Sequence, residues 1–575
     1  MDELDRRRRH KWWGWGPEEL AYDMLSRPKL WPFIRGTLQL PGDLSRTLPV
    51  PRETLRLPQR QEAAEFTREL LSRLRPDQLR FDDEDRLSHG FGRSYRDLVR
   101  LRAGRIERLP DMVLYPECHE DVEHALAAAL RHDVVLIPFG GGTNIVGCVE
   151  PKDNRGRTTV TLDLRRMNRL LSIDGESMTA DFEPGIFGPE LEDELGKKGF
   201  SLGHFPDSFL YSTLGGWLAT RSAGTQSNAY GKIEDMVIAL QVATPQGTLR
   251  TRPLPAASNG PDLNRLIVGS EGILGIITRA TMRVHATPEV EQYRLVLFRK
   301  FEDGFHALSD CVREGFMPSL SRLSDGMETQ LMFAAKPTTS RLDSLLASPV
   351  KRLLQIRGYS QPAALIVAFE GPRQPAAQLQ QGAMRVLHRN GGFDLGSGPG
   401  QSWKHSRYDL PLLRDYVMDY GVIVDTFETA TSWSNVLPLY QTVGRVVRER
   451  CIEITGHPPY IGCHLSHLYA TGTCVYFTLG VWGGAGSGPQ QLIEKYWGIK
   501  QAVTSAILAA GGALSHHHAV GYEHQPWIEQ ELSPLGVASL RAIKQRLDPT
   551  AILNPGSLLS ASSVSQHSDT PTRRS

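Results

Sequence analysis

Hydrophobic positions alternate between two spacings from about residue 106 onward. Residues 121–131 (DVEHALAAALR) place apolar side chains three and four apart among strong helix formers, which predicts a helix. Residues 134–138 (VVLIP) then form a short apolar run, which is typical of a buried strand. Because strands and helices keep alternating, we predict an α+β fold, and a chain of 575 residues needs more than one core.

A glycine-rich turn directly follows the predicted strand. Glycines 140–142 precede Thr143 and Asn144, and glycines allow successive backbone N–H groups to converge on an anion. Ile145 stands where the third glycine of a G-x-G-x-x-G pattern would be, so this turn is not a Rossmann fingerprint. Taken alone, the turn indicates either phosphate binding or tight packing.

Two further segments strengthen the case for a bound dinucleotide. Residues 206–224 mix hydroxyl groups with paired glycines, and residues 269–278 repeat glycine every third residue before a strand. Three such loops in this order resemble the FAD-binding domain of the vanillyl-alcohol oxidase family. The resemblance implies a two-lobed domain that binds FAD, with the isoalloxazine ring at the border of a cap domain. The implied FAD-binding residues are Pro138, Phe139, Gly140, Gly141, Gly142, Thr143, Asn144, Asp207, Ser208, Ser212, Thr213, Thr220, Arg221, Ser222, Ala223, Glu271, Gly272, Ile273, Leu274, Gly275, Ile276 and Ile277.

Several more strings are similar to a narrower group, the alkyldihydroxyacetonephosphate synthases. These strings are GHFPDS (203–208), STLGGWLATRSAG (212–224), GSEGILGIIT (269–278), TFETATSW (426–433), CVYF (474–477) and SHHHAVG (515–521). The resemblance runs from the WGWG near the start to about residue 559. It implies an alkyl transferase that makes the ether bond of ether lipids by exchanging the fatty acid of acyl-dihydroxyacetonephosphate for a fatty alcohol. In this group a base removes a proton next to the ketone, flavin N5 holds that carbon, and the flavin leaves still oxidised.

The same resemblance assigns the proton transfer to Tyr476. A phenol that titrates near 10 is a poor base at neutral pH unless neighbouring cations lower its pKa. His516, His517 and His518 are the catalytic residues expected to help. On a strand, His516 and His518 share one face and His517 points away, so we expect at most two of them to face the flavin.

The same resemblance assigns the binding of the substrate's anionic groups to Arg322 (in SLSRLSD) and Arg414 (in LLRDY). We expect Arg414 to bind the phosphate or carboxylate of the substrate, because a guanidinium binds such groups bidentately. Arg322 is expected among the catalytic residues, and His204 beside the second loop is a candidate for the wall of the substrate site. A metal site formed by the triplet with Cys463, His464 and His467 is the alternative, but no acidic partner is evident and we expect no metal.

The resemblance leaves two other functions open. Asn554 to Leu559 (NPGSLL) is closer to flavin-linked hydroxyacid dehydrogenases, and the histidine triplet is followed by Ala519 where the synthases usually carry glycine. An FAD-linked oxidase or dehydrogenase of a 2-hydroxyacid is therefore the alternative, and a flavin-binding scaffold without turnover is the third hypothesis. We see no residue that would attach the flavin covalently, so we expect non-covalent FAD.

From these patterns we expect five regions. They are an N-terminal segment packing on the body (1–105), an FAD-binding domain (106–287), a cap or substrate domain (288–545), a C-terminal return to the flavin side (546–559) and a disordered tail (560–575).

Charge and cysteine content refine the expected partners and compartment. A net charge of +1 from 65 basic and 64 acidic residues gives no indication of nucleic acid as a partner. Scattered cysteines, an acidic start without a signal peptide, an Arg-Arg-Ser end without a peroxisomal address, and the lack of a roughly 20-residue apolar span favour a cytoplasmic protein. The basic run 6–11 beside tryptophans 12, 13 and 15 indicates either peripheral association with a membrane surface or tryptophans packed on the body. A homodimer and a monomer are both open.

Overall fold

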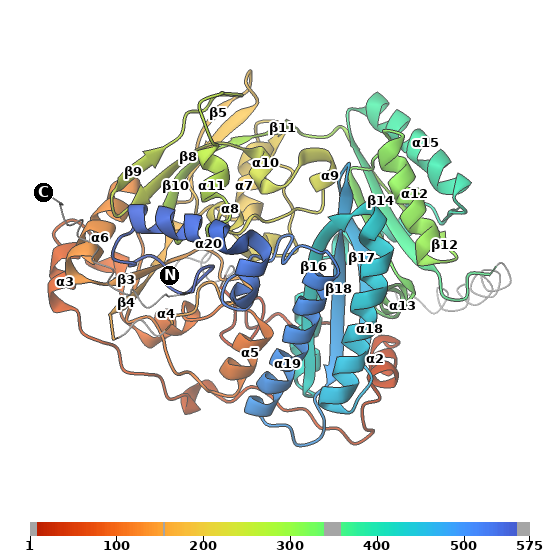
Figure 1. Ribbon diagram of the computed structural model, residues 1–575, viewed down its shortest axis with the longest axis horizontal. Helices are drawn as coiled ribbons and strands as arrows, with labels where there is room; N and C mark the ends of the chain where they lie inside the picture. Colours follow the sequence, from red (N-terminus) through yellow and green to blue (C-terminus); the bar gives the residue numbers. More distant parts are fainter. Residues whose placement is uncertain (1–8, 153–155, 338–357, 561–575) are drawn as a thin grey trace, which may run out of the picture.

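The computed structural model describes residues 9–152, 156–337 and 358–560, and its α+β architecture confirms the predicted fold class. The basic residues 6–8 and residues 561–575 of the expected disordered tail lie outside the described residues. Figure 1 shows the three larger sheets with helices packed around them. Among the described helices, none combines the length and apolarity that crossing a bilayer requires.

Two sheets carry the glycine loops. The first has the strand order β1-β2-β4-β3, in which β2, β4 and β3 are parallel, and the second is an antiparallel sheet with the order β5-β6-β10-β8-β9. The helix predicted at 121–131 and the strand predicted at 134–138 are observed as α6 and β3. The strand bounds are β1 Leu79–Arg80, β2 Met112–Leu114, β3 Val135–Phe139, β4 Thr159–Asp163, β5 Leu170–Asp174, β6 Thr179–Phe182, β8 Val237–Thr244, β9 Gly247–Arg250 and β10 Ile276–Arg283, with a minor pair β7 Phe200–Ser201 and β11 His285–Ala286.

A seven-stranded antiparallel sheet forms the other half of the molecule. Its order is β15-β12-β14-β13-β17-β18-β16, so strands that are far apart in sequence become neighbours. In β18, alternate residues such as Phe477 and Leu479 enter the core against the covering helices, and Tyr476 and Thr478 point to the opposite face. The strand bounds are β12 Val290–Phe298, β13 Leu320–Ser324, β14 Ala363–Gly371, β15 Phe393–Asp394, β16 Val422–Ser432, β17 Tyr460–Leu468 and β18 Gly472–Trp482.

Helices cover the sheets and close the gap between them. α12 and α15 pack beside β12 and β14, and α18 and α19 lie over β16 to β18 (Figure 1). α2 from the N-terminal segment packs against α13 and β18, and α5 packs against α19 and β16. The helix bounds are α2 Leu30–Leu38, α3 Ala64–Leu70, α4 Asp83–Ser88, α5 Tyr95–Arg102, α6 His119–His132, α7 Gly188–Gly196, α8 Leu214–Thr220, α9 Ser227–Tyr230, α10 Ile233–Met236, α11 Leu263–Ile267, α12 Phe301–Arg313, α13 Gly326–Ala334, α15 Arg373–Arg389, α16 Gly398–Ser406, α17 Leu410–Met418, α18 Val436–Thr455, α19 Pro489–Ala509 and α20 Ile528–Leu547.

The tryptophans of the N-terminal segment pack on the body. Trp15 is buried against Tyr211 and its backbone N–H donates to Asp415 of α17, 2.6 Å away. Lys11 and Arg102 lie over the ring of Trp13, and Trp12 packs against the main core. The segment therefore joins the turn at Tyr211 to α17, and Trp15 forms part of the wall of the central cavity.

Candidate active site

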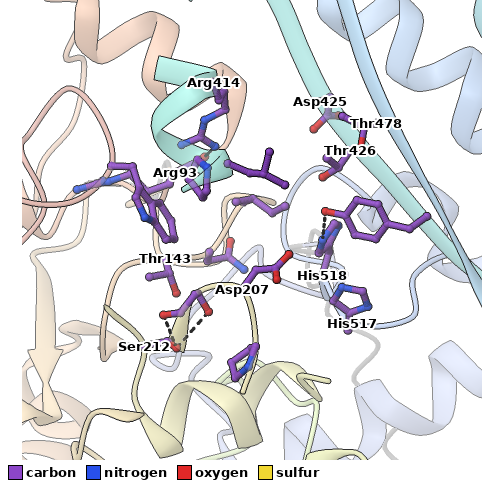
Figure 2. Close-up of a pocket in the computed structure, with 18 of the residues that line it drawn as sticks. Arg93, Thr143, Asp207, Ser212, Arg414, Asp425, Thr426, Thr478, His517 and His518 are labelled. Carbon is purple, nitrogen blue, oxygen red and sulfur yellow. Dashed lines mark hydrogen bonds between the residues drawn. The ribbon is translucent and has the colours of Figure 1, made fainter. Parts of the chain in front are cut away.

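A cavity of about 420 Å³ lies where the glycine loops meet the seven-stranded sheet. One wall comes from the loops after β3 and before α8, and the other from β16, β17 and β18 (Figure 2). One arm of the cavity is lined by apolar side chains of α2, α13 and α17, and the other end carries polar and ionisable groups. The apolar arm is lined by Phe33, Ile34, Leu38, Leu331, Leu410, Leu413 and Val417.

The first glycine loop has the properties that a bound diphosphate requires. The backbone N–H groups of Gly141, Gly142 and Thr143 have no hydrogen-bond partner within the described part of the chain. Gly142 adopts φ +67°, and a Cβ at Gly141 would meet the carbonyl oxygen of Tyr211 at 1.8 Å. Free donors on a loop that only glycine can build fit the diphosphate of FAD.

Most of the expected FAD-binding residues line this cavity, and several do not. Phe139 packs on the His89 ring, and Arg221 extends outward to Glu234. Ile273, Leu274 and Ile277 belong to the core of the second lobe, Ile276 belongs to the core of the first, and Gly275 is packed against Val242. The expected residues that line the cavity are Pro138, Gly140, Gly141, Gly142, Thr143, Asn144, Asp207, Ser208, Ser212, Thr213, Thr220, Ser222, Ala223, Glu271 and Gly272.

Three polar side chains form one row across the sheet. Tyr476 of β18 pairs in register with His464 of β17 on one side and with Glu428 of β16 on the other. The rings of His464 and Tyr476 stack with centroids 4.6 Å apart. Antiparallel pairing thus brings together residues that the sequence separates by dozens of positions.

The histidine triplet does not lie on a strand, which corrects the expected alternation. Residues 515–519 form a loop whose backbone is bound by a side chain. The Glu428 carboxylate accepts hydrogen bonds from the N–H groups of His516, His517 and His518 at 2.5, 3.1 and 2.8 Å, and from the Ser515 hydroxyl at 2.6 Å. These residues form no strand because their backbone N–H groups donate to a buried carboxylate instead of to the carbonyl groups of a neighbouring strand.

Glu271 binds the other end of this loop. Its carboxylate accepts the N–H groups of Val520 and Gly521, at 2.7 and 2.9 Å, and the hydroxyl of Ser557 at 2.8 Å. Asn554, in the C-terminal return, donates to the Glu271 carbonyl oxygen at 2.8 Å. The sequence placed Glu271 in the FAD loops, but its carboxylate supports the histidine loop.

This loop turns His517 and His518 toward the cavity and His516 away from it. His518 Nε2 lies 3.5 Å from the Tyr476 hydroxyl, and Figure 2 shows His517 and His518 on the same side of the cavity. His516 Nε2 instead contacts the Tyr469 hydroxyl at 2.5 Å. Lys232 donates to the His516 carbonyl oxygen at 2.7 Å, which fixes this orientation from behind.

Burial keeps the site neutral, contrary to the expectation that cationic histidines lower the pKa of Tyr476. Burial lowers the pKa of His518, and for His517 the neighbouring His518 adds to the effect of burial. Burial, then the negative charge of Asp207, raises the pKa of Tyr476. The histidines are therefore uncharged at neutral pH and can act as hydrogen-bond acceptors and proton acceptors.

The two expected arginines occupy different surroundings. Arg322 of β13 lines the cavity but is paired with Glu328 at 2.5 Å, and Glu328 also contacts His464 Nδ1 at 3.1 Å. Arg414 of α17 lines the cavity and donates from Nη1 to the carbonyl oxygen of Arg93 at 2.7 Å. Arg414 is therefore the more available of the two for a substrate anion.

His204 does not line the cavity. Its ring packs on Trp217, and its Nε2 lies 3.2 Å from the Ser222 hydroxyl. Burial, then Lys232, lowers its pKa to about 3. His204 supports the second glycine loop from behind, which differs from the expected place in the substrate wall.

The metal hypothesis based on Cys463 and His464 is not supported by the strand geometry. Cys463 enters the helix-side core, whereas its neighbour His464 faces the cavity. Among the described residues, Glu428, Cys474, His516 and His517 bring ligand atoms within 4.8 Å of one another. The Glu428 oxygens in that group already accept the loop donors.

Sequence reasoning missed Glu428, Arg93 and Glu328 as parts of the site. Glu428 lies within the string 426–433, but its partners lie near residue 516, far away in the sequence. The alternation along β16 could have placed Glu428 on the face of Thr426, but only the fold shows what that face meets. Arg93 carries no motif at all.

Comparisons with known proteins agree with this architecture. The model described as "FAD binding domain" matches residues 110–252, and "FAD linked oxidases, C-terminal domain" matches residues 287–558. The chain is 38% identical to the alkyldihydroxyacetonephosphate synthase of Dictyostelium discoideum, covering 97% of this chain and 94% of that protein. It belongs to the alkyldihydroxyacetonephosphate synthase family.

Two further matches support the same family. The Trypanosoma brucei brucei alkyldihydroxyacetonephosphate synthase is 39% identical over 88% of this chain and 82% of that protein. A solved alkyldihydroxyacetonephosphate synthase structure superposes with a TM-score of 0.82 at 36% identity, covering 96% of this chain and 99% of that one. The cofactor of this chain is FAD, as both domain models and the free donors of the first glycine loop indicate.

The role of Glu428 leads to the first prediction. Glu428→Gln keeps the shape of the side chain but leaves one acceptor oxygen and no charge. We therefore expect the loop to become more mobile and the free energy of unfolding to fall by about 1–3 kcal/mol. Thermal melting should fall, and hydrogen exchange should rise at residues 515–521. Glu370→Gln is the matched control, because Glu370 lies in the same sheet with Tyr230 as its partner. Unchanged exchange across the loop in Glu428→Gln would show that the carboxylate does not organise it.

Proposed function

We propose that this chain is an FAD-dependent alkyldihydroxyacetonephosphate synthase, which exchanges the acyl chain of acyl-dihydroxyacetonephosphate for a fatty alcohol. The observation that carries the proposal is the cavity, which joins an apolar arm to a polar end holding Tyr476, His518 and Arg414. An aliphatic chain fits the apolar arm, and a phosphorylated ketone fits the polar end. The similarity to alkyldihydroxyacetonephosphate synthases over 97% of the chain supports the same reaction.

Lipid substrates also explain the surface beside the apolar arm. Leu410 lines the cavity and is 45% exposed, and Phe333 at the end of α13 is 42% exposed. Leu25, ahead of α2, is 96% exposed. Apolar side chains around this end of the cavity favour peripheral contact with a membrane surface, from which the alcohol and the acyl substrate would enter.

The proton transfer can be derived from Tyr476, His518 and Glu428. The neutral His518 Nε2 faces the Tyr476 hydroxyl at 3.5 Å, and His518 Nδ1 faces a Glu428 oxygen at 3.7 Å. As Tyr476 takes the proton next to the ketone, its own hydroxyl proton moves to His518 Nε2, and Glu428 stabilises the resulting imidazolium. Contacts of this length are expected to shorten when substrate fills the cavity.

Held by the first glycine loop through the N–H groups of Gly141, Gly142 and Thr143, FAD would supply an electron-accepting ring. The protein positions the reacting carbon by binding the substrate at its two ends, with the chain in the apolar arm and the phosphate at Arg414. Apolar walls exclude water, so hydrolysis of the substrate is suppressed.

Flavin oxidation state separates the proposal from a hydroxyacid dehydrogenase. Under anaerobic conditions, we expect the flavin spectrum to remain oxidised after turnover with acyl-dihydroxyacetonephosphate and hexadecanol. D-Lactate should also leave it unchanged. Bleaching by D-lactate would favour the dehydrogenase, and the absence of alkyl product would contradict the synthase.

Attachment of the flavin gives the next prediction. Because we see no residue that would attach the flavin covalently, we expect acid precipitation to release all FAD into the supernatant. Yellow colour in the washed pellet would show a covalent link.

The role of Tyr476 predicts a specific loss of proton exchange. Tyr476→Phe should lower turnover by about 10²–10⁴-fold, since it removes the proton acceptor and keeps the ring. FAD content should be unchanged. Exchange of the ketone-adjacent proton with deuterated water should be lost together with turnover, and exchange at the wild-type rate would assign the base to another residue.

The pH profile tests the same relay. His518 must be neutral to accept a proton, and burial lowers its pKa below that of an ordinary histidine. The turnover rate should therefore fall only as the pH drops through a value below about 6.5. The His518→Gln variant should turn over slowly at every pH and should not show this fall at acidic pH. His516→Ala serves as the control, because His516 faces Tyr469, and it should still show this fall.

A further inference from the structure

Two arginines lie side by side at the polar end of the cavity. Arg93 comes from the N-terminal segment just before α5, and Arg414 comes from α17, more than three hundred positions later. Both line the cavity, and the Arg414 guanidinium donates to the backbone carbonyl oxygen of Arg93 (Figure 2). Arg93 is 3% exposed, so the surrounding fold holds its side chain in place.

Both guanidiniums carry donors that the described residues do not satisfy. Arg93 Nη1 donates to the Gly92 carbonyl oxygen at 2.7 Å, and its Nε has no partner. Arg414 Nε and Nη2 also have none, and Nη2 lies 3.7 Å from Asp415 Oδ1, beyond hydrogen-bond reach. Buried charged donors without acceptors are costly, and their occurrence in adjacent side chains indicates a ligand with several acceptor oxygens.

Each neighbouring carboxylate has one oxygen engaged by another group, while Asp415 Oδ1 and Asp97 Oδ1 have no hydrogen-bond partner among the described residues. Asp415 accepts the Trp15 N–H at 2.6 Å and lies 3.7 Å from Lys11 Nζ. Asp97 caps α5 together with Ser94. Burial, with the nearby charge of Arg414 acting in the same direction, lowers the pKa of Arg93 to about 10. Two like charges in a poorly solvated place are stabilised by an anion between them.

The position of the pair relates it to the reacting end of the cavity. Burial lowers the pKa of Arg414, and Tyr476, which lines the same cavity, is close enough to oppose part of this shift. The FAD diphosphate has its own donors in the N–H groups of Gly141, Gly142 and Thr143.

We propose that Arg93 and Arg414 together bind the phosphate of the substrate, so that the N-terminal segment supplies one of the two guanidiniums of this subsite. The proposal rests on the proposed function for the identity of the substrate. Its chemistry, recognition of a phosphate monoester by two forked donors, is independent of turnover.

Binding of dihydroxyacetone phosphate to the FAD-loaded enzyme tests the subsite. The probe is titrated calorimetrically, with dihydroxyacetone, which lacks the phosphate, in a parallel titration. We expect Arg93→Gln to raise the Kd for dihydroxyacetone phosphate about 10- to 100-fold. Arg93→Lys should recover part of the loss, because it restores the charge without the fork. In the assay with acyl-dihydroxyacetonephosphate, KM should rise more than kcat falls.

Arg96→Gln is the matched control. Arg96 lies on α5 three residues away, but its guanidinium is paired with Glu150 at 2.7 Å. This variant should bind dihydroxyacetone phosphate like the wild type, and its melting temperature shows what losing a partly buried arginine costs.

The other outcomes overturn the proposal in distinguishable ways. A raised Kd for FAD with unchanged binding of dihydroxyacetone phosphate would place Arg93 on the FAD diphosphate. Unchanged Kd values for both would make Arg93 structural. If the wild type binds dihydroxyacetone and its phosphate equally weakly, the subsite does not exist. If dihydroxyacetone phosphate binds as expected but no alkyl product forms, the subsite stands and the proposed reaction falls.

Discussion

The site depends on two buried carboxylates that bind one loop from opposite sides. Glu428 belongs to the seven-stranded sheet and accepts the N–H groups of the three histidines. Glu271 belongs to the flavin lobes and accepts those of Val520 and Gly521. A buried carboxylate without such donors would be strongly destabilising, so loop and carboxylates need each other. The loop thereby joins the two halves of the molecule where the cavity lies.

This constraint explains which histidines face the cavity. With the N–H groups of residues 516–518 directed at one carboxylate, the side chains diverge instead of alternating. His518 reaches Tyr476, and His516 reaches Tyr469. The position of the Glu428 carboxylate therefore determines which histidines face the cavity, and the sequence of the triplet alone does not.

Features that depend on neighbouring residues in the sequence could be predicted, and contacts between distant parts of the chain could not. The α6 and β3 elements and the glycine turn follow from spacing and from the conformational freedom of glycine, so the α+β fold and FAD binding could be predicted. The orientation of the triplet could not, because Glu428 lies 88 positions before His516. Arg93 was missed for the same reason, since only the packing of the N-terminal segment brings it beside Arg414. Ile276 and Ile277 were assigned to the cofactor because their motif is continuous with it, although a strand sends such side chains into the cores.

Burial poses an electrostatic problem for a reaction that moves a proton without net oxidation. It raises the pKa of Tyr476 and lowers that of His518, so the neutral pair is favoured before substrate binds. Moving a proton from the substrate through the phenol to the imidazole leaves a negative charge on the substrate and a positive one on His518, which an apolar site opposes. Glu428 lies 3.7 Å from His518 Nδ1 and offsets part of that cost. The same oxygen of Glu428 also accepts the N–H of His518, so one contact holds the loop and faces the ring that would become the imidazolium. The interaction that shapes the loop is thus also the one that makes proton transfer from Tyr476 feasible.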